Sequence, residues 1–569
     1  MQSLSEFINK TMQQWKVPGL AIAIVKDNEI IFCEGFGKRD VEQDLKVTPK
    51  TLFAIASCTK AFTTMTMGIL ADRGKLDWDK PVRNYLPTFK LYDSYATEHI
   101  TPRDLVTHRS GLPRHDAMWY KSSFTRQEIF ERLQYLEPTH ELRTVFQYQN
   151  LMYMTAGYLV GQIADSSWEE FVQQEIFNFL EMRDSNFSVV KSQETNDFAL
   201  PYQEKDDEVK KIPFCNIDVI SPAGSINSNV TDMAQWLLLH LNQGKYGEKQ
   251  IISSTNLSQM HFPQIVISQP LEYNEIFHNF YGLGWQVTAY RGHNFLEHGG
   301  NIDGFSALTT FLPQNNIGMV ILTNMDKTPL PRIVTYYVCD RLLGLEEVHW
   351  NERIKEKVAQ TKEAAAKEKE QIASERKTGT QPSHSLKDYI GDFEHPGYGK
   401  LSIEFKDNHL TATYNSIVYE LEHYHYDIFQ LKSEFVDKPQ MISFFTDTKG
   451  NITNLSVPLE PTFKDIVFTR MPDKGMTQIS FLAQFVGEYE FSGKIIKISL
   501  KDNRLVASLP GQSDSELVGY RETEFNLKDL PKNTIKFIRD PNGIFTQALI
   551  TQPNTLITQP NSVFTATKK

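Results

Sequence analysis

The sequence has few cysteines and no long apolar run. Its 569 residues include only four cysteines, none of them in a Cys-x-x-Cys pair: Cys33, Cys58, Cys215 and Cys339. This scarcity excludes a disulfide framework and a cysteine-based zinc site, so we expect four reduced, mostly buried thiols. A membrane-spanning helix needs about 20 consecutive apolar residues, and no run approaches that length.

The sequence also lacks an excess of positive charge. The formal net charge is −11, which argues against sequence-independent binding of nucleic acid, because such binding needs basic patches. The first ten residues lack the basic-then-apolar order of a signal peptide. The chain as given is therefore predicted to be cytoplasmic, whereas a chain whose signal peptide had been removed would look the same and be exported.

One stretch combines a serine and a lysine at helical spacing. Residues 53–62 read FAIASCTKAF, so Ser57 precedes Lys60 by three positions, and a helix-like run continues to Gly74. Residues three apart share one face of a helix. A lysine that has lost its proton can accept the serine proton, so this pair can form a nucleophile without histidine.

Two further short motifs carry candidate chemistry. Tyr148-Gln149-Asn150 stands just before an expected helix, where Tyr148 could act as a base and Asn150 could bind a substrate carbonyl. The alternative is a half-buried aromatic residue followed by a helix cap. His298-Gly299-Gly300 lies in an expected strand, where two glycines permit close approach of another group. Its alternative is an ordinary edge-strand histidine.

Apolar periodicity predicts an α/β domain in the first 345 residues. A helix is expected over residues 4–15, a strand hairpin over 20–32, and a second hairpin over 305–322. Helices dominate the sequence between the hairpins. If both hairpins join one antiparallel sheet, the terminal strands of the domain pair with each other.

The three motifs, taken in this order, resemble the serine β-lactamase and penicillin-binding-protein superfamily. The resemblance is to the class C-related branch of D-aminopeptidases, D-peptidases and esterases. It covers residues 1–345 and also rests on these stretches: Val17 to Gly19, Leu105 to Pro113, Pro222 to Ser225 and Tyr281 to Trp285. It implies an antiparallel sheet flanked by helices, with an additional all-helical subdomain.

The resemblance also implies roles for the motif residues. Ser57 would be the acylated nucleophile, and Lys60 and Tyr148 would share proton transfer, with the identity of the base left open. Asn150 would orient the substrate amide. His298 would be the catalytic-site residue where related enzymes have lysine, which weakens the case for a penicillin substrate. Substrate and oxyanion contacts would come from Gly299, Gly300 and Asn301, with the backbone N–H groups of Ser57 and Asn301 forming the oxyanion hole.

After residue 345 the composition changes to Lys, Glu and Ala, which predicts a charged helical linker over residues 346–384. A duplication with a period of roughly 95 residues follows. Residues 389–393 (YIGDF) match residues 485–489 (FVGEY), and turns such as Asp-Asn recur. Two small antiparallel β-barrels are expected over residues 385–473 and 474–569, similar to the lipocalin-like domains of some members of this branch.

We expect neither a metal nor a cofactor. His423 and His425 would share a strand face, but no third ligand has a recognisable spacing. The predicted partner is a small-molecule or short-peptide substrate, and a homo-oligomer is possible.

The sequence favours a serine hydrolase that cleaves D-amino-acid-containing peptides through an acyl-enzyme. A carboxylesterase or weak β-lactamase is the alternative in the same class. A catalytically silent ligand-binding scaffold is the alternative from another class.

Overall fold

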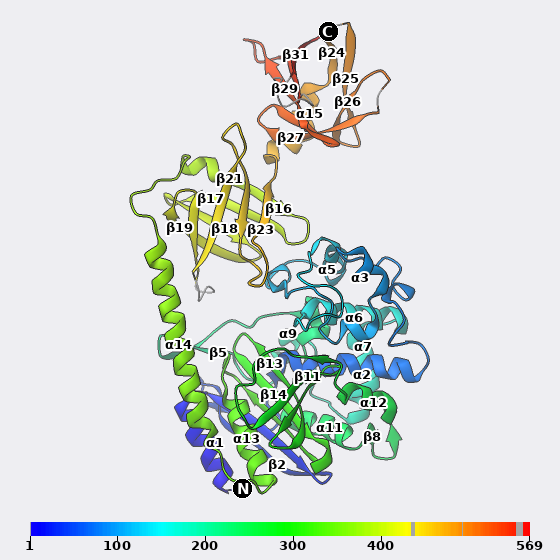
Figure 1. The fold of residues 1–569 in the computed structure, drawn as a ribbon, viewed down its shortest axis with the longest axis vertical. Helices are drawn as coiled ribbons and strands as arrows, with labels where there is room; N and C mark the ends of the chain where they lie inside the picture. Colours follow the sequence, from blue (N-terminus) through cyan, green and yellow to red (C-terminus); the bar gives the residue numbers. More distant parts are fainter. Residues whose placement is uncertain (1, 434–438, 492, 512, 554–561) are drawn as a thin grey trace. The chain divides into compact units, whose positions relative to one another are not determined.

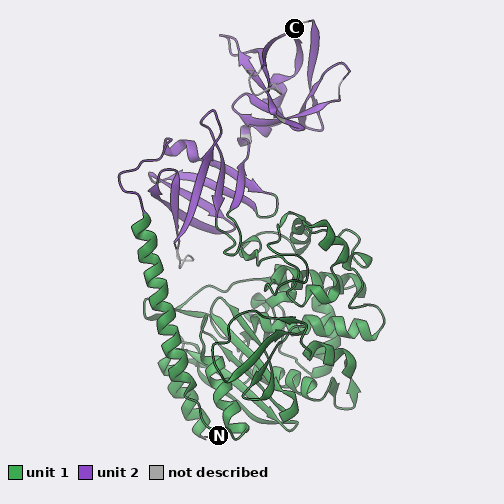
Figure 2. Cartoon of the chain, viewed as in Figure 1, with its two compact units in different colours: residues 1–375, 396–398, 458–465 green, residues 376–395, 399–457, 466–569 purple. Residues whose placement is uncertain are grey.

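The computed structural model describes residues 2–433, 439–491, 493–511, 513–553 and 562–569. The chain divides into two compact units (Figure 2). The first comprises residues 1–375 with the short segments 396–398 and 458–465, and the second comprises residues 376–395, 399–457 and 466–569. In the described part of the chain, every helix falls short of the length and apolar content needed to cross a bilayer.

A nine-stranded sheet forms the centre of the first unit (Figure 1). Its pairings are antiparallel, and in spatial order its strands are β10 (Ile265–Val266), β11 (Ile276–Tyr281), β12 (Gln286–Tyr290), β13 (His293–Ile302), β14 (Phe305–Leu312), β15 (Ile317–Thr323), β1 (Gly19–Lys26), β2 (Glu29–Asp40) and β3 (Leu45–Lys46). Strand β1 pairs with both β2 and β15, opposing Ile22 to Ile321. The prediction that the two terminal hairpins share one sheet is confirmed.

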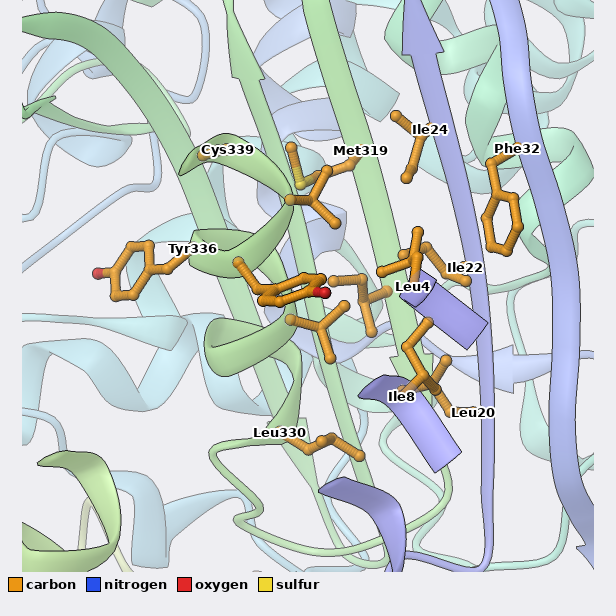
Figure 3. Close-up of a cluster of buried hydrophobic side chains, with 14 of the residues drawn as sticks. Leu4, Ile8, Leu20, Ile22, Ile24, Phe32, Met319, Leu330, Tyr336 and Cys339 are labelled. Atoms are coloured by element: carbon orange, nitrogen blue, oxygen red, sulfur yellow. The ribbon is translucent and has the colours of Figure 1, made fainter. Parts of the chain in front are cut away.

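Strand β1 is apolar without alternation, GLAIAIVK, because both of its faces are covered. Helices α1 (Gln2–Gln14) and α13 (Leu330–Leu342) cover one face. Their side chains join the sheet in a large buried cluster, part of which Figure 3 shows around Ile22, Met319, Leu330 and Tyr336. Helix α11 (Val230–Leu241) packs on the other face, against β1 and β15.

Helix α2 (Thr59–Asp72) lies within the helical part of this unit and is buried over residues 59–70. A helix that is buried all round needs no amphipathic pattern, and α2 carries threonines as well as apolar side chains. The remaining helices of the first unit are α3 (Ser94–His99), α4 (Pro102–Leu105), α5 (Arg126–Arg132), α6 (Asn150–Ala164), α7 (Trp168–Val172), α8 (Asn178–Leu180), α9 (Val189–Ser192), α10 (Ser221–Gly224), α12 (Ser254–His261) and α14 (Trp350–Glu375). Three two-stranded sheets accompany them: β4 (Phe53–Ala54) with β7 (Asn227–Ser228), β5 (Tyr202–Lys205) with β6 (Glu208–Lys211), and β8 (Lys245–Tyr246) with β9 (Lys249–Gln250).

The second unit contains two closed eight-stranded barrels, as the duplication predicts. The first is built from β16 (Gly391–His395), β17 (Gly399–Lys406), β18 (His409–Tyr414), β19 (Ile417–His425), β20 (Ile428–Lys432), β21 (Gln440–Thr446), β22 (Ile452–Val457) and β23 (Ile466–Arg470). The second follows α15 (Ile479–Leu482) and is built from β24 (Gly487–Phe491), β25 (Lys494–Lys501), β26 (Arg504–Ser508), β27 (Ser515–Arg521), β28 (Glu524–Leu527), β29 (Leu530–Arg539), β30 (Phe545–Gln552) and β31 (Ser562–Lys568).

The duplicated segments occupy equivalent places in the two barrels. Tyr389 and Phe485 each end a 3₁₀ turn that precedes the first strand, and both side chains are fully buried. Both barrels have a bulge in the fourth strand, at His423/His425 in the first and at Gly519/Arg521 in the second. The predicted second-barrel range also contains residues 492, 512 and 554–561, which lie outside the described residues.

Candidate active site

Ser57 lies in a 3₁₀ turn, η1 (Ala56–Cys58), immediately before α2. Ala56 has a φ of 45°, a left-handed conformation that is costly for a residue with a side chain and is found mainly where the surrounding structure enforces it. Cys58 donates its thiol hydrogen to the carbonyl of His298 at 3.1 Å, which ties the turn to β13. Ser57 is partly exposed, so a substrate can reach its hydroxyl.

Glycine is required where β13 passes this turn. A Cβ atom at Gly300 would lie 2.1 Å from the carbonyl oxygen of Ile55 and 3.0 Å from the backbone nitrogen of Ser57. The strand backbone therefore approaches the serine closely, as the paired glycines predict. Gly299 is its neighbour on β13, and Asn301, the next residue, is exposed and accepts a hydrogen bond from Ser306 at 2.8 Å.

Lys60 is fully buried, and its Nζ lies among three oxygen atoms. These are Ser57 Oγ at 3.0 Å, Asn150 Oδ1 at 2.8 Å and the carbonyl oxygen of Ala223 at 2.8 Å. Burial, with a smaller contribution from the positive charge of Arg114, holds the pKa of Lys60 well below its usual value. A neutral amine has two N–H groups, enough for the amide and carbonyl oxygens. Its lone pair then faces the serine hydroxyl, which is the arrangement a general base requires.

Asn150 is the first residue of α6, and both the oxygen and the nitrogen of its side-chain amide make hydrogen bonds. Its Oδ1 accepts the hydrogen bond from Lys60, while its Nδ2 donates to Asp116 Oδ1 at 2.9 Å. Asp116 also accepts from Arg114 Nε at 2.6 Å. These contacts fix the orientation of the amide.

The Tyr148 phenol lies beside the Ser57 side chain. Burial raises the pKa of Tyr148 above its ordinary value, although the neighbouring Ser57 side chain opposes this, so the phenol keeps its proton. Lys60 Nζ and the Arg114 guanidinium lie 4.8 Å and 5.0 Å from the centroid of the phenol ring. A protonated phenol beside a serine, the Lys60 amine and the Arg114 guanidinium is suited to donate a proton.

His108 supports the Tyr148 loop from behind. Its ring centroid is 4.2 Å from that of Tyr148, and its Nδ1 accepts a hydrogen bond from the backbone of Gln149 at 3.0 Å. Burial holds the pKa of His108 well below its usual value, so the ring is neutral. His108 therefore fixes the backbone from which Tyr148 and Asn150 project.

Both ring nitrogens of His298 are engaged by protein groups. Nδ1 lies 2.7 Å from the carbonyl of Gly299 and must donate to it, so Nε2 accepts from the Tyr281 hydroxyl at 2.9 Å. Burial and the nearby Lys60 lower the pKa of His298 to about 3. The ring is thus neutral and offers no positive charge to a substrate carboxylate.

The short segments 396–398 and 458–465 also contact this part of the first unit. The Tyr398 hydroxyl lies 2.6 Å from Nδ1 of His115, and Glu460 accepts a hydrogen bond from the His115 backbone at 2.7 Å. His115 has a φ of 49° and stands between Arg114 and Asp116. The two segments thereby brace the turn that holds Asn150.

Comparison with known proteins agrees with this geometry. A family model described as Beta-lactamase matches residues 4–339. The chain belongs to the beta-lactamase family. A second model, a domain of unknown function (DUF3471), matches residues 375–470, which include the first barrel.

Curated relatives of this beta-lactamase family member are distant in sequence. It is 26% identical over 430 residues to unguisins hydrolase ungD' of Aspergillus campestris, covering 71% of this chain and 77% of that protein. It is 27% identical over 342 residues to protein flp of Staphylococcus aureus, covering 59% of this chain and 65% of that protein.

Solved structures show the same fold. The octameric penicillin-binding protein homologue from Pyrococcus abyssi matches with a TM-score of 0.56 and 22% identity, over 82% of this chain and 99% of that one. The D-amino acid amidase from Ochrobactrum anthropi SV3, complexed with L-phenylalanine amide, matches with a TM-score of 0.50 and 21% identity, over 60% of this chain and 98% of that one.

The sequence motifs omitted several residues that complete the site of this beta-lactamase family member. His108 and the carbonyl of Ala223 lie in stretches that carry the family resemblance, but the resemblance assigned no role to either. Arg114 and Asp116 follow one such stretch directly. Their role depends on tertiary contacts with Tyr148 and Asn150, which no spacing in the sequence indicates.

Proposed function

We propose that the protein is a serine hydrolase that works through an acyl-enzyme on Ser57. The observation that supports this most strongly is the position of Lys60 Nζ, buried, 3.0 Å from Ser57 Oγ and held by two other acceptors. In this mechanism Ser57 Oγ attacks a substrate carbonyl as its proton passes to the neutral Lys60. Tyr148 then donates its proton to the leaving group and is reprotonated through Lys60. Water hydrolyses the ester by the reverse proton path.

We propose amide or peptide bonds next to D-amino acids as the substrate class. An amide nitrogen is a poor leaving group unless it is protonated, and the phenol of Tyr148 supplies that proton. The neutral state of His298 removes a cation that could bind the carboxylate of a penicillin. The printed names of two similar proteins, a D-amino acid amidase and a hydrolase of unguisins, support the D-amino acid class and hydrolysis, respectively.

An esterase or weak β-lactamase remains the alternative within the hydrolases. A silent scaffold is disfavoured because hydrogen bonds join Ser57, Lys60 and Asn150, and the Tyr148 ring lies 4.8 Å from Lys60 Nζ. The homo-oligomer remains a prediction, to be measured by light scattering; the solved homologue from Pyrococcus abyssi is described as octameric.

Covalent labelling tests the proposal. A fluorophosphonate probe should label the wild-type protein and not Ser57→Ala. Ser374→Ala, an exposed serine replacement on α14, is the matched control and should label normally. Equal labelling of wild type and Ser57→Ala, or no labelling of either, would reject the acyl-enzyme.

A substrate panel then separates the alternatives. D- and L-aminoacyl anilides, nitrophenyl esters and a chromogenic cephalosporin would be compared by kcat/KM. We expect the D-anilides to be cleaved faster than their L counterparts and the cephalosporin to be the poorest substrate. Faster cleavage of the L-anilides would overturn the proposed substrate class while leaving the serine hydrolase intact.

A further inference from the structure

A cavity of about 370 Å³ opens on the face of the sheet that carries α13. It is lined by strands β12 and β13, by α13, and by residues 269–273 between β10 and β11. Glu297 lines this cavity, whereas the next residue of β13, His298, packs toward Lys60 and Tyr281. Successive strand residues point to opposite faces, so the cavity is separate from the Ser57 site. Its volume lies within the range of about 300–1,000 Å³ usual for small-molecule sites.

The cavity contains a buried carboxylate that is only half satisfied. Glu297 is 2% exposed, and its Oε1 accepts a hydrogen bond from Arg332 Nη1 at 2.8 Å. Its Oε2 is also buried and has no hydrogen-bond partner among the described residues. Buried polar atoms almost always have a partner, so an unpartnered carboxylate oxygen in a cavity indicates a missing donor.

Arg332 is the positively charged partner of Glu297, and its guanidinium has further N–H donors. Its Nη1 contacts Glu297 and also donates to the Tyr336 hydroxyl at 3.0 Å. Both of these hydrogen bonds use Nη1, and the Arg332 side chain is 39% exposed, so its Nε and Nη2 can reach a ligand. A guanidinium can bind a carboxylate through two parallel N–H groups, and this edge remains available.

The walls around this ion pair are aromatic. The rings of Tyr290 and Tyr336 stack with centroids 5.0 Å apart and an interplanar angle of 8°. Phe295 and Tyr273 also line the cavity. The uncharged polar residues Asn279, Gln286 and Thr288 line it as well. Aromatic surfaces combined with convergent polar groups are found in small-molecule sites.

We propose that this cavity binds a free amino acid with an aromatic side chain. The ligand ammonium would donate to Glu297 Oε2, and its carboxylate would accept from Nε and Nη2 of Arg332. Glu297 and Arg332 already neutralise each other, so a ligand carrying one charge would leave an uncompensated charge in a buried site. A zwitterion keeps the site neutral. The other lining carboxylate, Glu272, is exposed to solvent and is therefore screened.

Calorimetry with the full-length protein tests the proposal directly. L- and D-phenylalanine would be titrated beside phenethylamine, which lacks the carboxylate, and 3-phenylpropionate, which lacks the ammonium. We expect phenylalanine to bind at least about 10-fold more tightly than either analogue, since each charged hydrogen bond contributes about 1.5–3 kcal/mol. No binding of phenylalanine, or equal binding of phenethylamine, would overturn the proposal.

Substitutions in the cavity test whether phenylalanine binds there. Glu297→Gln should weaken phenylalanine binding by about 10-fold or more. Ile276→Trp should fill the cavity and abolish binding while leaving the ion pair intact, so it decides the matter if Glu297→Gln is unstable. Ile30→Trp, on an exposed part of the same sheet, is the control and should bind normally. Binding that survives Ile276→Trp but is lost in Asn150→Ala would place the amino acid in the Ser57 site and reject the proposal.

Discussion

The two faces of the central sheet differ in what they bury. The face toward α1 and α13 buries a continuous apolar cluster that includes Ile22, Met319 and Leu330 (Figure 3). On the opposite side, β13 passes the candidate active site, where Lys60 and His298 are 0% and 5% exposed. Outside the cavity that holds Glu297, the α13 face stabilises the domain by apolar burial, whereas the other side carries buried polar groups of the candidate active site, which cost stability.

Magnitudes support this division. Full burial of an Ile or Met side chain stabilises a protein by about 1.5–3 kcal/mol. Burial of a charged amine without a carboxylate partner is unfavourable. The pKa of Lys60 is therefore lowered, and the neutral amine is favoured. Replacing residues on one face should therefore change catalysis, and replacing residues on the other should change stability.

The largest effect is expected for Lys60→Met, which keeps the length of the side chain and removes the amine. Acylation of Ser57 should fall by about 10³–10⁴-fold, because the serine loses the group that accepts its proton. The free energy of unfolding should change little, because the gain from replacing a buried amine with an apolar group is offset by the loss of the donor to Asn150 Oδ1 and the Ala223 carbonyl. Stopped-flow labelling and urea unfolding measure the two quantities. A large loss of stability would show that Lys60 is structural.

Ile321→Ala tests the other face. Ile321 is fully buried and lies opposite Ile22 across the β1–β15 pair. The cavity left by the substitution should lower the free energy of unfolding by about 2–5 kcal/mol, measured by urea denaturation. Acylation per folded molecule should be unchanged. Val41→Ala, at an exposed position, is the control. A catalytic defect in folded Ile321→Ala would contradict the division between the faces.

The sequence predicted the parts of this arrangement that depend on short spacings. Ser57 with Lys60, and Tyr148 with Asn150, are local pairs, and the structure brings all four into one cluster. The apolar strands at both ends of the domain predicted the shared sheet, because a strand that is apolar on both faces belongs in the middle of a sheet with helices on both sides. Ser57 lies in a separate 3₁₀ turn before α2, and this turn depends on the left-handed conformation of Ala56. No sequence pattern predicts that conformation for an alanine.

Other features depend on contacts between distant segments. Nothing in the spacing of His298 indicates that Tyr281 occupies its Nε2, because the two residues meet across the sheet. Likewise, Asp116 reaches Asn150 only through the fold of the intervening loop. The sequence could thus predict which candidate residues lie together, whereas their protonation and orientation required the tertiary structure.

Tyr148→Phe separates two proton transfers in the candidate active site: from Ser57 to the base, and from Tyr148 to the leaving group. Acylation by anilides should fall by about 10²-fold, because the leaving amine loses its proton donor. Acylation by nitrophenyl esters should fall much less, since nitrophenolate leaves without a proton. The ratio of the two rates, measured by stopped-flow, is the readout. An equal loss for both substrates would make Tyr148 the base instead.

The smallest effect concerns His261, which lies 2.9 Å from His240 where α11 and α12 meet. Burial lowers the pKa of His261 to about 3 and lowers that of His240 in the same direction. An unfolded histidine titrates near pH 6.5, so the unfolded chain takes up the proton first as the pH falls. The stabilisation that each neutral ring contributes is therefore fully present above about pH 6.5 and is lost progressively toward the folded-state pKa.

Between pH 7.5 and pH 5, His261 alone should lower the free energy of unfolding by about 2 kcal/mol. His261→Gln removes this titration, so its stability should depend less steeply on pH than that of the wild type, although its stability at neutral pH falls because the bond to His240 is lost. Buried His108 and His298 act in the same direction and remain in both proteins, so only the difference between the two slopes reports His261. His349→Gln, at an exposed position, should leave the slope unchanged. If the free energy of unfolding depends equally on pH in wild type and His261→Gln, the folded protein accepts the proton on His261. The buried polar side of the sheet would then accommodate a charged imidazolium.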